Sequence, residues 1–83
     1  MRKRNHNPVY LDADVLWASI DVIAEQRNMS LPKLALHAGL DQSTFSHARR
    51  RRNWMSLQTL AKLLNHYQIP ISDWAKMVEE RGA

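Results

Sequence analysis

The most informative part of the chain reads Ser30-Leu-Pro-Lys-Leu-Ala-Leu-His-Ala-Gly39-Leu-Asp-Gln-Ser-Thr-Phe-Ser-His-Ala-Arg49. Two short segments with helical apolar spacing lie on either side of one glycine, as in two helices joined by a tight turn. Gly39 suits the turn because glycine accepts left-handed dihedrals, and Ala35 is small where two helices must approach closely. Leu40 and Phe45 supply apolar contacts that fix the angle between the helices. This spacing predicts a helix-turn-helix.

Helical spacing continues on both sides of this motif, and alternating strand-like runs are missing. The sequence therefore predicts an all-α fold of five helices. The first helix is expected to begin after Asp12 or Asp14, either of which can cap it, and to run to about Asn28. The later helices are expected to begin at Ser30, Asp41, Ser56 and Ser72.

The predicted core consists of residues that share one face of a helix at about 100° per residue. They are Leu16, Ile20, Ile23 and Ala24 in the first helix, Leu57, Leu60, Ala61 and Leu64 in the fourth, and Trp74 and Val78 in the fifth. A chain of 83 residues can bury one modest core of this kind, which excludes a large multi-layer enzyme.

Composition limits the class of protein and of partner. The absence of cysteine excludes disulfides and thiolate zinc sites and fits a reducing cytoplasm. Twelve Lys and Arg against eight Asp and Glu give a net charge of +4, which favours a polyanionic partner. No apolar run approaches the roughly 20 residues of a membrane span, and the start lacks the apolar segment of a signal peptide. We expect a soluble cytoplasmic protein.

The chain is expected to contain one domain and one arm. Residues 1–10 are polar and basic and are predicted to form a flexible arm, and residues 11–83 form the helix-turn-helix domain. In the arm, Arg2, Lys3 and Arg4 are candidates for minor-groove or backbone contacts with DNA. The alternative is a merely solvated tail.

Four segments carry a resemblance to a known family: Leu16-Trp17, Ala38-Gly-Leu-Asp-Gln-Ser-Thr-Phe45, Trp54-Met-Ser-Leu-Gln-Thr-Leu-Ala61 and Ile71-Ser-Asp-Trp74. With them the chain resembles the phage-repressor-like (lambda-repressor or Cro-type, XRE-like) helix-turn-helix family from about Asp14 to Val78. It is similar in particular to the amino-terminal domains of bacterial regulators that carry a self-cleaving serine peptidase domain. The resemblance implies a five-helix, lambda-repressor-like DNA-binding domain associated with the bacterial nucleoid. No peptidase activity is expected of this chain.

Two features depart from the family pattern, and both concern the loop after the third helix. Met55 stands where the family commonly has proline. No glycine follows the third helix, where this chain instead has the run Arg49-Arg-Arg-Arg52.

The predicted third helix has one polar face. At about 100° per residue, an arc of roughly 140° contains Gln42, Ser43, Ser46, His47 and Arg50, whereas Phe45 and Ala48 lie opposite. Glutamine can pair bidentately with adenine, serine bonds flexibly, and histidine or arginine can donate to guanine. The resemblance implies that this helix enters the major groove and that the base-reading residues are Gln42, Ser43, Ser46 and His47. The alternative is an ordinary solvent-exposed face.

The end of this helix carries four consecutive arginines, namely Arg49, Arg50, Arg51 and Arg52. Cations there complement the helix dipole, but four exceed what a helix end needs, and this favours contact with phosphate. Further candidates for positioning the phosphate backbone are Ser30, Lys33 and Thr44. Such contacts orient the protein and do not select a sequence.

Other residue groups give no site. The four histidines lack the spacing of metal ligands, so no metal is expected. Ser43 and His47 lie four residues apart, but a nucleophile also needs an orienting acid and an oxyanion pocket. The tryptophans and Tyr67 are scattered and are assigned to the core or a subunit contact. No catalytic residue, cofactor or small-molecule ligand is therefore expected.

Two functions of different classes remain. The first is a sequence-specific regulator of transcription, a repressor, that binds double-stranded DNA. The second is a protein-interaction module of the same fold, such as the toxin-binding antitoxin of a toxin–antitoxin pair. A module of that kind should expose an apolar patch in place of the polar face and the basic helix end.

The DNA-bound form is expected to be a two-fold symmetric homodimer on a near-palindromic operator. One helix of this kind reads too few base pairs to be selective in a genome, and symmetry doubles the site. The predicted subunit contact is formed by Tyr67, Ile69, Ile71, Trp74 and Met77, because more apolar groups occur there than one closing helix needs.

Overall fold

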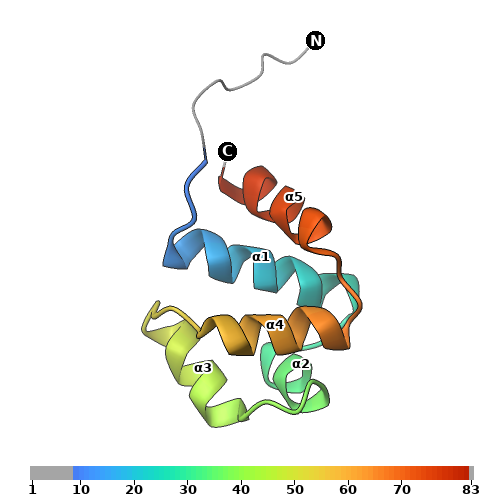
Figure 1. Ribbon diagram of the computed structural model, residues 1–83. Helices are drawn as coiled ribbons and strands as arrows, with labels where there is room; N and C mark the ends of the chain where they lie inside the picture. The colour runs from blue at the N-terminus through green and yellow to red at the C-terminus, as the bar shows by residue number, and fades with distance from the viewer. Residues whose placement is uncertain (1–8, 83) are drawn as a thin grey trace.

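The computed structural model describes residues 9–82, and in this range the chain forms five helices and no strand: α1 (Ala13–Gln26), α2 (Leu31–His37), α3 (Gln42–Arg50), α4 (Leu57–His66) and α5 (Ile71–Gly82). α5 packs against α1 on one side of the molecule, and α2 packs against α3 on the other (Figure 1). The prediction of an all-α, five-helix fold is confirmed. None of these five helices is both long and apolar enough to cross a membrane.

Four helices begin where the sequence predicts a cap. The carboxylates of Asp12 and Asp41 accept backbone N–H groups of the following turn at 2.8 and 2.9 Å. The hydroxyls of Ser30 and Ser56 do the same for α2 and α4, at 3.3 and 3.0 Å. Each cap satisfies an N–H group that has no partner inside its helix. Of the two acidic residues considered for α1, Asp12 is the cap.

The start of α5 lies two residues before the predicted one, because Pro70 takes the position before the helix that was predicted for Ser72. The helix begins at Ile71, so that Ser72 is already inside its first turn. The carbonyl of Pro70 accepts the amides of Asp73 and Trp74 at 3.0 and 3.1 Å. The prediction that α5 begins at Ser72 is therefore wrong. The backbone carbonyl of Pro70, a residue with fixed φ, accepts the first amides of this helix, a role that was expected of the Ser72 hydroxyl.

Helices α1 to α4 all end with the same backbone motif. The second residue after each helix has a positive φ: Asn28 (53°), Gly39 (75°), Arg52 (58°) and Gln68 (54°). The next amide then donates back into the last helical turn, as the Asn53 amide does to the Ala48 carbonyl at 2.8 Å. The loop after α3, which lacks a glycine, is thus closed by Arg52 in a left-handed conformation that is costly for a residue with a side chain.

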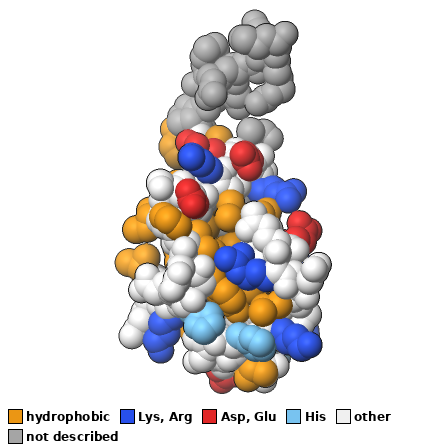
Figure 2. Space-filling view, turned by 90° about the vertical axis from the view of Figure 1, so that its right-hand side faces the viewer, with side chains coloured by type: hydrophobic (Ala, Val, Ile, Leu, Met, Phe, Trp, Pro, Cys, Tyr) orange, Lys and Arg blue, Asp and Glu red, His pale blue; other side chains and the backbone are white. Residues whose placement is uncertain are grey.

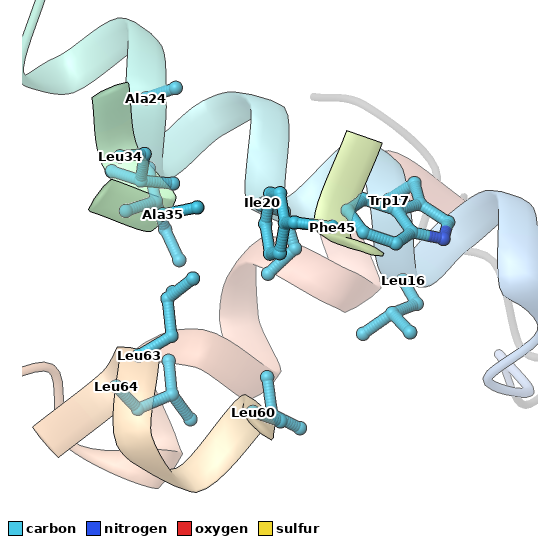
Figure 3. Close-up of a cluster of buried hydrophobic side chains, with 11 residues drawn as sticks. Leu16, Trp17, Ile20, Ala24, Leu34, Ala35, Phe45, Leu60, Leu63 and Leu64 are labelled. Carbon is cyan, nitrogen blue, oxygen red and sulfur yellow. The ribbon is translucent and has the colours of Figure 1, made fainter. Parts of the chain in front are cut away.

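One hydrophobic core joins α1 to α4. It consists of Leu16, Trp17, Ile20, Ile23, Ala24, Leu34, Ala35, Phe45, Leu60, Leu63 and Leu64. Figure 3 shows the leucines of α4 facing the side chains of α1 and α2, with Phe45 beside Trp17. The four core residues predicted for α1 are all buried, as is Val78 of α5. The described residues therefore form the single core that the length of the chain allows.

The predicted core face of α4 was partly wrong. Leu57 is 81% exposed and Ala61 is also exposed, whereas Leu63, which was not predicted, is fully buried. Leu60, Leu63 and Leu64 form the apolar stripe, and Leu57 and Ala61 lie to one side of it at about 100° per residue. The sequence pattern allowed either stripe, and the position of α4 against α1 and α2 selects one of them.

Two aromatic residues of the carboxy-terminal part, Trp74 and Tyr67, form hydrogen bonds with earlier helices. Trp74 Nε1 donates to Ser19 Oγ at 2.9 Å, and the Tyr67 hydroxyl donates to the Leu34 carbonyl at 2.8 Å. Burial raises the pKa of the Tyr67 hydroxyl above its ordinary value, against a smaller opposing effect of the Arg27 guanidinium, which lies 4.9 Å from the ring centre. The phenol therefore remains a hydrogen-bond donor at neutral pH.

These contacts correct the surface predicted for a subunit contact. Tyr67, Ile69, Trp74 and Met77 pack against the core of their own chain. Ile71 is the one member of the predicted set that is largely free, with 75% of its surface exposed. The surplus of apolar groups inferred from the sequence disappears because α5 packs against α1 and the residues of the closing segment pack against the core.

Candidate nucleic-acid interface

Trp17, a fully buried residue of α1, contacts both α3 and the loop that follows it. Its ring meets that of Phe45 edge to face, with 5.0 Å between the ring centres and 79° between the planes. Its indole Nε1 donates to the Asn53 carbonyl at 2.8 Å, in the loop after α3. One side chain therefore fixes both α3 and the loop that follows it, and the opposite face of α3 is left outward.

The outward face of α3 carries the residues predicted to read bases. Gln42, Ser43 and His47 are exposed, and Ser46 is half-buried. On the opposite side Phe45 is 4% exposed. The predicted division of α3 into a polar and an apolar face is confirmed. The face offers amide, hydroxyl and imidazole groups, which can both donate and accept hydrogen bonds.

A hollow of about 320 Å³ separates the start of α2 from α3, and it is lined by Leu31, Pro32, Ser46, Arg49 and Arg50. The fold thus brings the polar face of α3 next to the first turn of α2. Ser30 and Lys33, the predicted phosphate-positioning residues of that turn, are both exposed beside it.

Thr44 lies apart from this group. It borders a different cavity of about 270 Å³, on the side of α3 that faces α4, together with Trp54, Met55 and Thr59. The sequence predicts that Thr44 positions phosphate together with Ser30 and Lys33, but the structure does not bring Thr44 together with these two residues. At about 100° per residue it falls outside the arc of the base-reading candidates.

Two of the four arginines in the run form ion pairs with aspartates of α1, and the other two do not. Arg49 Nη2 lies 3.3 and 3.4 Å from the two carboxylate oxygens of Asp21, and Arg52 Nε lies 3.5 Å from Asp14. Arg50 and Arg51 are exposed and form no ion pair with any described residue. Only Arg50 and Arg51 are directly available to an external anion.

Asp14 and Asp21 are the residues of this region that the sequence analysis missed. They stand seven positions apart in α1, a spacing that places both on the same face of a helix. This seven-residue spacing could have identified an acidic stripe on α1 from the sequence, but not the arginines that pair with it. Both carboxylates turn out to face arginines of the α3 end.

Exposed apolar side chains do not gather on the outward face of α3. The large ones among the described residues are Tyr10, Leu11, Leu36, Trp54, Leu57 and Ile71, on five different parts of the chain. On the face in Figure 2, the apolar area is interrupted by basic and histidine side chains. The arm residues Arg2, Lys3 and Arg4 lie outside the described residues.

Residues 19–80 match the family described as "Cro/C1-type HTH DNA-binding domain". This range includes α2, α3 and α4 completely and most of α1 and α5. Comparisons with curated proteins and with solved structures give no match.

Proposed function

The chain belongs to the family of Cro/C1-type helix-turn-helix DNA-binding domains, and from this premise we propose that it is a sequence-specific transcriptional repressor. The observation that carries the proposal is the outward face of α3, which is polar, exposed and held rigidly through Trp17. Its groups are hydrogen-bond donors and acceptors suited to base edges, and the residues after it are basic. A protein-docking module would need an apolar patch at the same place.

The amino-terminal part of α3 enters the major groove, with Gln42, Ser43, Ser46 and His47 as base readers. Gln42 has the leading role, because it is exposed at the first position of the helix and its amide can pair bidentately with adenine. Ser46 is half-buried beside the hollow and therefore contributes less to reading than the other three residues do.

Phosphate contacts come from both sides of this face. Arg50 and Arg51 are the primary contacts, and Ser30 and Lys33 position the backbone at the start of α2. Arg49 and Arg52 reach phosphate only by exchanging a carboxylate partner. Thr44 contacts phosphate on the side of α3 that faces α4. The arm with Arg2, Lys3 and Arg4 adds contacts outside the major groove.

Gln42→Ala and Arg51→Ala should weaken DNA binding in different ways. On an operator obtained by selection from a random duplex library, Gln42→Ala should cost about 1 to 3 kcal/mol and relax the preference at one base pair. Arg51→Ala should weaken binding to all duplexes about equally, because phosphates are the same at every site. The measurement is fluorescence anisotropy on the selected duplex, on its single-base variants and on a scrambled duplex.

Gln26→Ala is the matched control, because Gln26 is an exposed glutamine at the end of α1 that lies beside Lys76 and Met77 of α5, away from the proposed face. If Gln42→Ala weakened matched and scrambled duplexes alike, the assignment of base readers would be wrong. If no duplex were enriched over the starting library, the proposal of a sequence-specific repressor would fail.

The repressor acts as a two-fold symmetric homodimer on DNA, with half-sites about one helical turn, roughly 34 Å, apart. The subunit contact is small, because Ile71 is the part of the carboxy-terminal apolar group that stays largely exposed. A small contact gives weak association in solution, and the DNA completes the dimer by holding both copies.

The expected stoichiometry is two chains per full operator and one per isolated half-site. The free protein should be largely monomeric at micromolar concentration, and the second chain should bind the full operator more tightly than the first. Sedimentation of the protein titrated with each duplex measures both quantities. One chain per full operator, with the affinity of the half-site, would contradict the dimer.

A further inference from the structure

The two ion pairs between α1 and the end of α3 differ in how easily they open. The Arg52 and Asp14 side chains are 58% and 76% exposed, whereas those of Arg49 and Asp21 are 39% and 37% exposed. Exposed ion pairs contribute little to stability because water screens both charges. The Arg52–Asp14 pair is therefore the one that an external anion can replace.

Arg49 is bound more firmly than Arg52. Its Nη2 contacts both carboxylate oxygens of Asp21, and its Nε is buried, with no hydrogen-bond partner among the described residues. Moving this guanidinium to an external phosphate would leave Asp21 unpaired and half-buried, which is costly. Arg49 thus ties α3 to α1, and the tie has a role in positioning α3.

Asp14 presents to Arg52 the same kind of group that DNA presents. A carboxylate and a phosphate are both anionic oxygen acceptors that match the planar guanidinium. In the free protein, Asp14 neutralises one of the four charges in the arginine run. Transfer of Arg52 to a phosphate releases a DNA counterion but leaves Asp14 without its cation.

We propose that Asp14 limits the affinity of this domain for DNA by competing with phosphate for Arg52, and that Asp21 instead fixes α3 through Arg49. This rests on the proposed function. The two acidic residues therefore have opposite effects on DNA binding, although they lie on one face of one helix and each pairs with an arginine.

The test is a double-mutant cycle of Asp14→Asn and Arg52→Gln on the selected operator. Asp14→Asn should tighten binding about twofold to fivefold, the range expected from the strength of an exposed ion pair. It should also steepen the log–log salt dependence by up to about 0.9 for each chain. In the Arg52→Gln background, Asp14→Asn should have no effect, because no competing pair remains. Asp14→Glu, which keeps the carboxylate, should bind like the unmodified protein.

Asp21→Asn should act in the opposite direction, with weaker binding to every duplex and a lower midpoint of thermal unfolding. Glu25→Gln is the matched control, because Glu25 is also an exposed acidic residue of α1 in an ion pair, with Arg81 at 3.7 Å. Its partner lies on α5, so the same loss of one negative charge should leave DNA affinity unchanged.

Equal tightening by Asp14→Asn in both backgrounds would overturn the proposal, because it would show general repulsion of the DNA by Asp14. Equal tightening by Glu25→Gln would overturn it in the same way. If the protein bound no selected duplex, the proposed function would be contradicted as well. If it bound the operator and the effects of Asp14→Asn and Arg52→Gln were additive, only the proposed role of Asp14 would be contradicted.

Discussion

The affinity of this domain for its operator should fall about a thousandfold when monovalent salt rises from about 50 to 200 mM. Lys33, Arg50 and Arg51 of each chain are exposed and are the proposed phosphate contacts that no carboxylate holds. In a homodimer they neutralise about six phosphates, and each releases roughly 0.9 counterion from duplex DNA. The expected slope of log affinity against log salt is therefore about −5. Anisotropy titrations at four or five salt concentrations measure it.

Single substitutions give this prediction an internal check. Arg51→Ala should make the slope shallower by about 0.9 for each chain. Lys76→Ala removes the same charge from α5, on the side of α1 away from α2 and α3, and should leave the slope unchanged. A flat salt response of the unmodified protein would contradict the proposed phosphate contacts and, with them, DNA binding through α3.

Trp17→Ala should remove a large fraction of the free energy of unfolding of this domain at 25 °C. Removing a fully buried tryptophan costs roughly 3 to 5 kcal/mol, and a domain of this length is stable by only about 4 to 12 kcal/mol in total. The substitution also removes the edge-to-face contact with Phe45 and the hydrogen bond to the Asn53 carbonyl. Urea unfolding followed by circular dichroism measures the loss.

Two further variants separate the contributions of this side chain. Trp54→Ala removes the same residue type where 55% of its surface is exposed, and it should cost less than about 1 kcal/mol. Trp17→Phe keeps an aromatic ring against Phe45 but loses the bond to Asn53, so an intermediate loss is expected. If Trp17→Ala and Trp54→Ala were equally mild, Trp17 would not be the residue that holds α3.

The sequence was sufficient for features that depend on residues within one turn of each other. Ser30, Asp41 and Ser56 cap their helices as predicted, and Asp12 is the one of the two predicted candidates that caps α1, because a cap joins a side chain to an amide two or three residues later. The exception is Ser72, because α5 begins at Ile71 and the Pro70 carbonyl accepts its first amides. The turn at Gly39 and the two faces of α3 follow from backbone preference and helical periodicity in the same way. These local rules were enough to predict the helix-turn-helix and the polar face.

What only the tertiary structure decided involves partners far apart in the chain. Arg49 pairs with an aspartate 28 residues away, Trp17 donates to a carbonyl 36 residues away, and Trp74 reaches a serine 55 residues away. In the sequence the four arginines are equivalent, and Leu57 is as good a core residue as Leu63. The packing of α1 against the α3 end and α4 removes both equivalences, because it determines which carboxylates face the arginines and which leucines lose contact with water.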